Sequence, residues 1–171
     1  HEYWGIEPTA PAASVAEQQL DRVLMGTYED KKAALPDHYF DLIICNDVIE
    51  HMTDHDFFLE NIKSKLQAVG VIVASIPNVR HILNLYEVLV KKDWAYKAEG
   101  ILDRTHFRFF TQKSLLATLH RHQYEVQFFQ GINAYVGDTW MKKLISQVAI
   151  GILGQDTRFL QFAVRFRVKE V

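Results

Sequence analysis

The most chemically suggestive stretch of the sequence is Asn46-Asp47-Val48-Ile49-Glu50-His51. A helix that begins at Asp47 would place Asp47, Glu50 and His51 on one face near its N-terminus, because they are spaced at i, i+3 and i+4. Two carboxylates and an imidazole in that arrangement can bind a divalent cation or hold a general base. A capping box is the structural alternative, since an acid three residues after an Asp cap also satisfies free backbone N–H groups. The spacing leaves both interpretations open.

A second candidate segment runs from Asp103 to Thr111 and interleaves charged residues with aromatic ones. Such a loop, placed before a helix capped by Thr111, could close over a site and would carry His106 with it. The alternative is an exposed strand in which Phe107 and Phe109 face the core. We expect the remaining histidines, among them His55, His120 and His122, to lie on helix surfaces, and we assign them no role.

A third candidate is Glu7, at the end of a short apolar segment. A carboxylate at the end of a strand can accept hydrogen bonds from both hydroxyls of a ribose, as an acidic residue does in dinucleotide-binding folds. A solvated acid at a strand end is the alternative. Polar residues also follow other expected strands, at 26–29, at 46–47 and at 77–78, where open α/β sheets bind ligands.

The elements that must position these residues alternate along the chain. We expect helices over 12–20, from a cap at Thr53 or Asp54 to Gly70, over 81–91, after Thr111 and over 139–153. We expect strands over 3–7, 23–26, 40–45, 71–76, 124–129 and 159–168, with a polar loop over 27–39. Residues 40–45 and 71–76 are continuously apolar, which indicates burial on both faces, whereas 159–168 alternates. The pattern predicts an α/β fold: a doubly wound, mostly parallel sheet with one antiparallel strand near the C-terminus.

Size and composition support one domain over residues 1–171. The chain has 49% hydrophobic and 23% charged residues and a formal net charge of −2, so it is neither disordered nor strongly attracted to nucleic acid. The single cysteine, Cys45, is expected to be a buried thiol in a reducing compartment. No apolar stretch is long enough to span a bilayer and no signal peptide is evident, so we expect a cytoplasmic protein. Phosphate-loop, nucleophile-elbow and His-Glu-x-x-His motifs are absent, which argues against P-loop and hydrolase chemistry.

The residues resemble the class I S-adenosylmethionine-dependent methyltransferases. The resemblance is carried by Gly5-Ile6-Glu7-Pro8, by Tyr39 through His51, and by Gly70 through Pro77-Asn78, and it covers most of residues 3–130. Residues 46–51 are similar to the branch with an Asp-Val-Leu-Glu-His-like motif. Gly100 through Thr111 looks like a segment of bacterial members linked to polysaccharide and cell-surface glycan synthesis. The resemblance implies a Rossmann-like methyltransferase fold and S-adenosylmethionine as cofactor.

The resemblance also assigns roles to individual residues. Glu7 matches the acid that binds the cofactor ribose, and Thr27-Tyr28 stands where the family often has an Asp against the adenine. Asn46 matches the strand-end residue near the methionine part of the cofactor. His51 occupies a position that lines the methyl-transfer pocket.

Two groups of relatives imply a metal. Small-RNA 2′-O-methyltransferases and some ubiquinone-pathway O-methyltransferases carry an acid-x-x-Glu-His motif that binds magnesium, and in the RNA enzymes a further His precedes an aromatic-rich stretch. The matching residues here are Asp47, Glu50, His51 and His106. The resemblance therefore implies Mg²⁺ at these four residues.

The sequence departs from the family at its start. Members open with a strand and a Gly-x-Gly-x-Gly turn, and nothing of that kind precedes Gly5. We expect an N-terminally truncated fragment whose first strand is missing, or a gap that another segment or subunit fills. A sheet without that strand would expose two long edges.

The function expected from all of this is O-methylation of a sugar, a glycan-related molecule or another small acceptor, with His51 or His106 as general base. The first alternative is a non-catalytic binding or assembly module. It would dock, for instance as a homodimer, through an exposed strand edge or the helix at 139–153. The second is a metal-dependent RNA 2′-O-methyltransferase, against which the lack of a basic stripe counts.

Overall fold

The computed structural model describes residues 1–169, which form two compact units, one comprising His1–Tyr39 and one beginning at Phe40. The first unit contains β1 (Trp4–Glu7), α1 (Ala10–Ala16), β2 (Arg22–Met25), α2 (Tyr28–Lys31) and a 3₁₀ turn (Lys32–Ala34). β1 and β2 pair in parallel, with Glu7 opposite Met25. Their carboxyl ends therefore lie side by side.

The start of α2 corrects the polar loop expected over 27–39. The Thr27 hydroxyl accepts a hydrogen bond from the backbone N–H of Asp30, and the Asp30 carboxylate accepts one from the backbone N–H of Thr27. This reciprocal pair is a capping box, which satisfies two of the free donors at the helix start. The sequence contains this capping box as Thr27-x-x-Asp30, but the helix that it begins, α2, is only four residues long.

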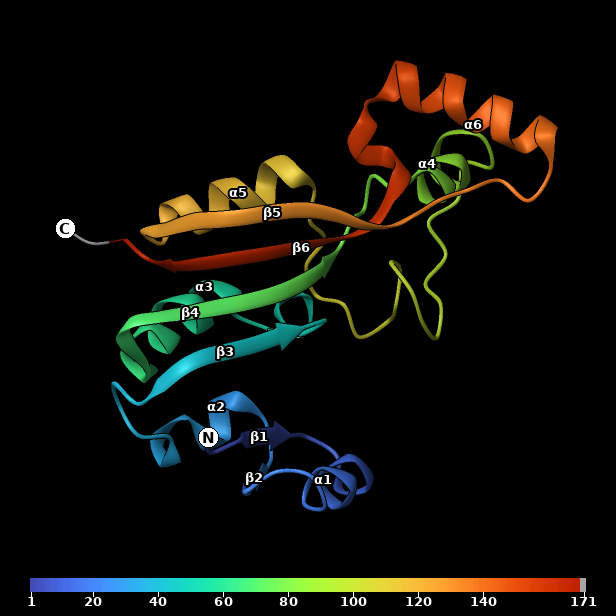
Figure 1. The fold of residues 1–171 in the computed structure, drawn as a ribbon. Coiled ribbons are helices and arrows are strands. Elements are labelled where there is room, and N and C mark those ends of the chain that lie inside the picture. The colour runs from blue at the N-terminus through green and yellow to red at the C-terminus, as the bar shows by residue number, and fades with distance from the viewer. Residues whose placement is uncertain (170–171) are drawn as a thin grey trace. The chain divides into compact units, whose positions relative to one another are not determined.

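The second unit is built around a four-stranded sheet (Figure 1). Its elements are β3 (Phe40–Asn46), α3 (His55–Asn61), β4 (Leu66–Pro77), α4 (Ile82–Leu89), α5 (Gln112–Arg121), β5 (Tyr124–Ala134), α6 (Trp140–Leu153) and β6 (Phe159–Val168). Single 3₁₀ segments lie at Ile49–His51, Ile62–Lys65 and Gln155–Arg158. The strand order is β3-β4-β6-β5.

Strand directions make this sheet mixed. β3 and β4 are parallel, whereas β6 runs antiparallel to both of its neighbours, β4 and β5. The α/β class and the antiparallel strand at 159–168 are therefore confirmed. The mostly parallel, doubly wound sheet is not confirmed.

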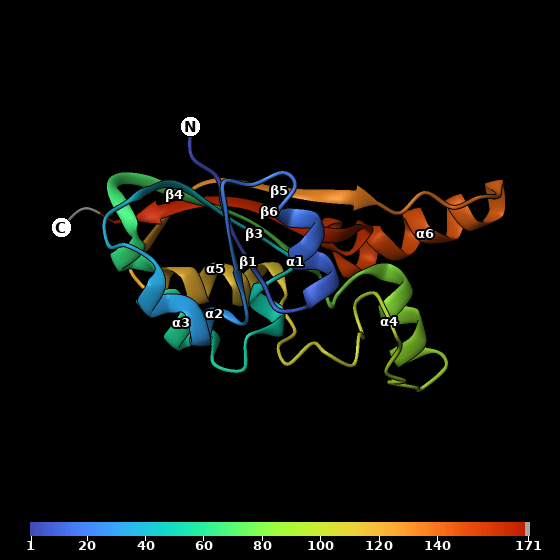
Figure 2. The same ribbon diagram turned by 90° about the horizontal axis from the view of Figure 1, so that it is seen from below.

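The core of the second unit lies between the sheet and two helices. Figure 2 shows α3 and α5 on the same side of the strands, and their side chains Phe58, Leu59, Leu115 and Leu119 are buried together with Ile72, Val164 and Phe166 of the sheet. Cys45 is buried in β3, and burial raises the pKa of its thiol to about 12, so the expected packed thiol is confirmed. Leu42 and Ile44 alternate with Cys45 and are exposed on the opposite face, so the burial on both faces expected for residues 40–45 is wrong.

The helix expected from residue 54 to Gly70 ends earlier. The Asp54 carboxylate caps α3 by accepting from the Phe57 N–H at 2.8 Å, but the helix ends at Asn61 and β4 has begun by Leu66. Gly70 lies inside β4, where an added Cβ would come within 2.8 Å of the Phe40 carbonyl oxygen. The glycine permits a close approach of β3 and β4 rather than ending a helix.

Two further observations concern the surface. Among the residues described, no helix combines the length and apolar character that crossing a membrane requires. α6 nevertheless exposes six large apolar side chains on one side: Trp140, Met141, Leu144, Ile145, Val148 and Ile152.

Candidate functional site

The candidate site begins where β3 ends. Asp47 adopts a left-handed backbone conformation with φ of 50°, and the chain then makes one 3₁₀ turn over Ile49–His51. Val48, not Asp47, occupies the cap position of that turn, and no side chain caps it. The capping box considered for Asp47 and Glu50 therefore does not form, and the Glu50 carboxylate needs a different explanation.

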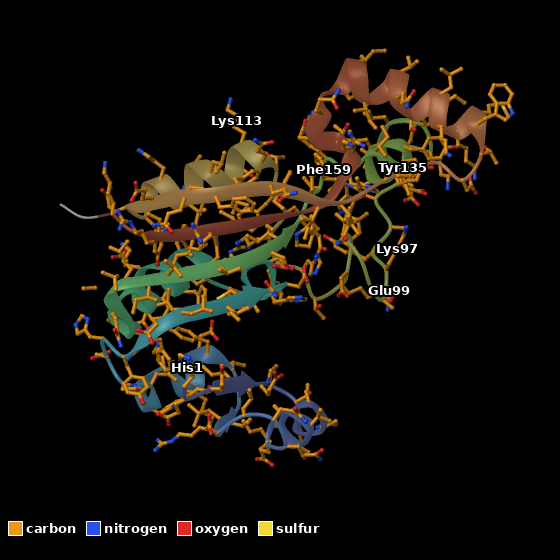
Figure 3. The ribbon with its side chains drawn as sticks, in the orientation of Figure 1. His1, Lys97, Glu99, Lys113, Tyr135 and Phe159 are labelled. Carbon is orange, nitrogen blue, oxygen red and sulfur yellow. The ribbon has the colours of Figure 1, made fainter. Side chains whose placement is uncertain are left out.

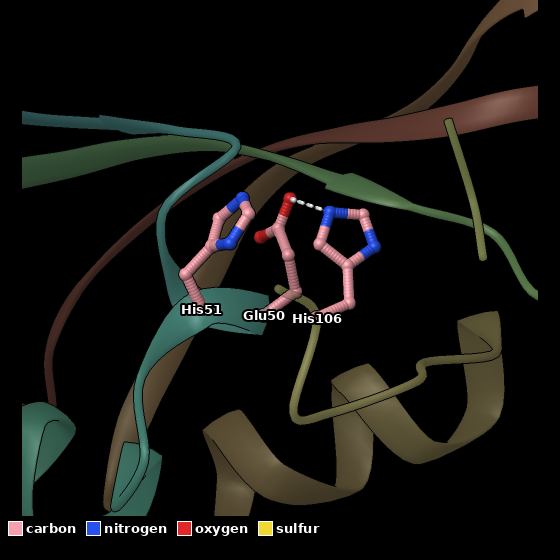
Figure 4. Close-up of side chains that lie close together, drawn as sticks. All are labelled: Glu50, His51 and His106. Carbon is pink, nitrogen blue, oxygen red and sulfur yellow. Dashed lines mark ion pairs between the residues drawn. The ribbon is translucent and has the colours of Figure 1, made fainter. Parts of the chain in front are cut away.

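Glu50 lies between two imidazoles (Figure 4). Glu50, His51 and His106 each offer one ligand atom, and these three atoms all lie within 4.8 Å of one another. The Glu50 Oε1 is 4.0 Å from Nε2 of His106, and the two imidazole centroids are 4.6 Å apart. Glu50 is 1% exposed, and neither carboxylate oxygen has a hydrogen-bond partner among residues 1–169. A buried carboxylate without a partner is costly, so this cluster indicates a site that takes up a ligand or a proton.

Backbone carbonyls orient both rings. Nδ1 of His51 lies 3.1 Å from the Thr105 carbonyl oxygen, and Nδ1 of His106 lies 2.9 Å from the Ile101 carbonyl oxygen. Donation from Nδ1 to a carbonyl leaves the Nε2 lone pair available, which is how metal-binding and proton-accepting histidines are usually held.

The loop that carries His106 is fixed to the turn that carries Glu50. The backbone N–H groups of Phe107 and Arg108 both donate to the Glu50 carbonyl oxygen, at 2.9 and 3.1 Å. Arg108 also donates from its guanidinium to the Thr53 carbonyl oxygen at 2.8 Å. These bonds hold residues that are more than 50 positions apart in the sequence in one cluster.

The electrostatics of Glu50 follow from its burial. Burial raises the pKa of the Glu50 carboxyl to about 8, and the nearby carboxylate of Asp47 adds to the rise. A positive charge beside Glu50 would reverse this preference for the neutral form. A carboxylate with two imidazole nitrogens is a donor set that divalent cations accept, so the residues present fit a metal ion.

Asp47 is not part of this set of ligand atoms. Its carboxylate accepts hydrogen bonds from Nε2 of Gln161 at 2.5 Å and from the Ser75 hydroxyl at 3.3 Å. Gln161 belongs to β6, so Asp47 joins the end of β3 to a distant strand. The metal set implied by the resemblance is thus reduced in the structure to Glu50, His51 and His106.

The residues expected to hold the cofactor lie at strand ends. Glu7 ends β1, and Asn46 is exposed at the end of β3, in register with Ser75. The Thr27 hydroxyl is already engaged with Asp30, and Tyr28 is buried. Glu7 is therefore placed at a strand end, as a ribose-binding acid requires. The side chains of Thr27 and Tyr28 are less suited to contact an adenine, because one is engaged and the other is buried.

Asn78 was selected as a polar residue at a strand end, but its contacts are structural. Its side-chain N–H₂ donates to the carbonyl oxygens of Asp156 and Phe159 at 2.8 and 2.9 Å, and its oxygen accepts from the Arg80 N–H at 3.0 Å. With no exposed surface, Asn78 fastens the end of β4 to the entry of β6.

Only some of the residues that line the pocket beside His106 could be predicted from the sequence. A cavity of about 480 Å³ is lined by Tyr96, Arg104, His106, Phe107 and Phe109. The sequence predicts a site in the segment Asp103 to Thr111 but does not indicate Tyr96. A parallel bridge between Lys97 and Asp103 brings Tyr96 to the cavity. No local sequence pattern indicates that bridge.

The comparisons with known proteins agree with this architecture. A family model described as a methyltransferase domain matches residues 1–127. No curated protein matches the chain significantly. Among solved structures, a SAM-dependent methyltransferase from Archaeoglobus fulgidus is 17% identical with a TM-score of 0.61, covering 95% of this chain and 74% of its own.

Two other solved structures show how widely the fold is used. A Thermotoga maritima SAM-dependent methyltransferase, described as a possible histamine N-methyltransferase, is 18% identical with a TM-score of 0.64, covering 98% of this chain and 73% of its own. The [4+2]-cyclase SpnF is 14% identical with a TM-score of 0.62, covering 99% and 67%. Such distant likenesses establish the α/β methyltransferase fold, and a cyclase among them shows that fold alone does not fix the reaction. Because the family model spans most of the sequence, the chain belongs to the methyltransferase-domain family.

Proposed function

We propose that this chain serves S-adenosylmethionine-dependent methylation of a hydroxyl oxygen on a small acceptor, such as a sugar or a glycan-related molecule. The observation that carries the proposal is the buried carboxylate of Glu50, which lies between His51 and His106 and has no hydrogen-bond partner in the described part of the chain. Oxygen methylation requires the loss of a hydroxyl proton, and this cluster offers groups that can accept one.

His106 is the proposed general base. Its Nδ1 lies against the Ile101 carbonyl oxygen, which leaves the Nε2 lone pair for a proton, and His106 also lines the adjoining cavity. An imidazole does this efficiently near neutral pH. Glu50, beside Nε2, would stabilise the imidazolium that results.

A divalent cation held by Glu50, His51 and His106 is the second way to activate the hydroxyl. Bound there, a cation would supply Lewis acidity that lowers the pKa of an acceptor hydroxyl. Mg²⁺ was implied by resemblance, but Mg²⁺ prefers oxygen ligands, and two of the three donors here are nitrogens. Mn²⁺ and Zn²⁺ fit the donor set better, so both should be tested beside Mg²⁺.

The cofactor would be held by strand-end residues. S-adenosylmethionine supplies an electrophilic methyl group on a sulfonium sulfur. We propose that Glu7 accepts hydrogen bonds from the ribose hydroxyls and that Asn46 contacts the methionine part, with the backbone around Thr27 and Tyr28 beside the adenine.

Glu7→Gln tests the cofactor proposal. We expect it to weaken S-adenosylhomocysteine binding by about 10- to 100-fold, because hydrogen bonds to a charged acceptor are worth roughly 1.5 to 3 kcal/mol. Calorimetric titration should compare this chain with a form extended upstream, and Glu17→Gln, an exposed acid after α1, is the control.

Two outcomes would count against the proposal. Equal effects of Glu7→Gln and Glu17→Gln would remove Glu7 from the site. If neither form binds S-adenosylhomocysteine, the catalytic proposal fails and a non-catalytic binding or assembly module becomes the better description.

A further inference from the structure

The loop between α4 and α5 carries an unusual group of exposed aromatic side chains. Trp94, Tyr96 and Phe107 are 41%, 52% and 53% exposed. Phe109 lies among them, with ring centroids 5.4 Å from Trp94 and 6.5 Å from Tyr96. Isolated exposed aromatics need no explanation, but a group around one cavity marks a binding surface.

The cavity lies where an acceptor must be placed. The loop, on which Figure 3 labels Lys97 and Glu99, passes the carboxyl ends of β3 and β4 in Figure 1, which is the side of an α/β sheet that binds ligands. His106 belongs both to the cavity wall and to the cluster with Glu50 and His51. A hydroxyl bound in the cavity would therefore lie next to the proposed base.

Arg104 provides the positive charge of this cavity. Its guanidinium is exposed, and it forms no hydrogen bond or ion pair within residues 1–169. The adjacent carboxylate, Asp103, is engaged by the backbone N–H and the hydroxyl of Thr105 at 2.7 and 2.6 Å. The other arginine of the loop, Arg108, is held by the Thr53 and Phe107 carbonyl oxygens. Arg104 is thus left available for a ligand.

The backbone holds Arg104 in a defined place. The Arg104 N–H donates to the Lys97 carbonyl oxygen at 3.1 Å, and the Lys97 N–H donates to the Leu102 carbonyl oxygen at 2.8 Å. With the backbone held in this way, the exposed Arg104 side chain can change rotamer at the cavity without reorganisation of the loop. A guanidinium so placed matches a carboxylate or phosphate through paired N–H donors.

We infer that the cavity of Tyr96, Arg104, His106, Phe107 and Phe109 binds the methyl acceptor as a hydroxylated ring compound that carries a carboxylate or phosphate. The ring would pack against the aromatic side chains, the anion would bind Arg104, and a ring hydroxyl would face His106. A volume of about 480 Å³ is within the usual range of small-molecule sites. The inference rests on the proposed function for the identity of the reaction, but the binding itself can be measured without it.

The test is a calorimetric comparison of charged and neutral ring compounds. Glucuronate and glucose 6-phosphate are compared with glucose, and 3,4-dihydroxybenzoate with catechol, so that sugar and aryl acceptors are separated. We expect at least one anion to bind about tenfold more tightly than its neutral analogue. Arg104→Gln should remove that preference, whereas Arg165→Gln, an exposed arginine of β6, should leave it unchanged.

The outcomes separate this inference from the proposed function. If each neutral compound binds as well as its anion, or if Arg104→Gln changes nothing, the inference is overturned. S-adenosylhomocysteine is titrated into the same samples. If S-adenosylhomocysteine binds but none of the ring compounds does, only the acceptor pocket is overturned. If an anionic ring compound binds but S-adenosylhomocysteine does not, the pocket is supported and the result counts against the proposed function.

Discussion

Glu50→Gln is expected to stabilise the protein at pH 8 and at the same time to remove metal binding. The unfolded chain releases the Glu50 proton near pH 4.5, whereas burial raises the pKa in the folded protein to about 8. Between these values the folded state holds a proton that the unfolded state has lost, so the stability of the wild type falls as pH rises from about 4.5 to 8. Glutamine cannot ionise and avoids this loss, which amounts to about 4 kcal/mol at pH 8.

Urea unfolding in EDTA at several pH values measures the first effect, and Mn²⁺ titration measures the second. The difference between variant and wild type should be small at pH 4.5 and grow toward pH 8. Glu60→Gln is a matched control of opposite sign, because Lys63 holds the pKa of that exposed carboxyl below its usual value. A stability difference that does not vary with pH would show that Glu50 is not a buried, raised-pKa carboxyl.

A gain in stability together with a loss of metal binding in Glu50→Gln would mean that the site keeps a residue that destabilises the fold. A buried acid without a partner persists when function requires it, and its replacement commonly raises stability while activity is lost. Loss of Mn²⁺ binding in Glu50→Gln, together with the gain in stability, would identify Glu50 as a ligand. A stability gain with Mn²⁺ affinity retained would instead favour the His106 general-base route.

Asn78→Ala is expected to destabilise the second unit by about 3 kcal/mol, because it removes three hydrogen bonds of a fully buried side chain, each worth about 1 kcal/mol. The side chain of Asn78 bonds the carbonyl oxygens of Asp156 and Phe159 and the N–H of Arg80, and none of its surface is exposed.

The urea midpoint of Asn78→Ala measures this loss. Asn133→Ala is the comparison, since Asn133 is exposed and makes one side-chain bond, from its N–H₂ to Oε1 of Gln161. Its φ of 54° strains an Ala by about 1 kcal/mol, so a loss of about 1 kcal/mol is expected there. Equal midpoints for the two variants would show that the Asn78 bonds do not stabilise the fold.

Much of the fold could be predicted because the spacing of apolar residues along the sequence indicates where strands and helices lie. The continuous run in β3 and the alternation in β6 placed both strands with nearly correct bounds. The end of α3 was mispredicted because Leu66 continues the helical spacing of Phe58 and Ile62, yet Leu66 pairs with Phe40 in the sheet. That pairing joins positions far apart in the sequence, so helical spacing alone could not exclude it.

The candidate site was predictable in its residues but not in its geometry. Glu50, His51 and His106 were selected by type and by resemblance, and the structure brings them together. The separation of Asp47 depends on its left-handed backbone and on Gln161 from β6. Neither is visible locally, because one is a backbone state and the other a contact across 114 positions.

The central position of β6 has a consequence for the order in which the chain folds. β6 contributes the last strand described, yet it lies between β4 and β5. β4 can pair with β3 earlier, but β5 has no other partner among the described strands until residues 159–168 have been synthesised. During translation β5 would remain an unpaired strand for the 24 residues between Ala134 and Phe159. Pairings between distant segments form slowly and leave strand edges exposed to aggregation. The nascent chain is therefore most vulnerable just before its C-terminal strand emerges, and chaperone binding should be strongest in that interval.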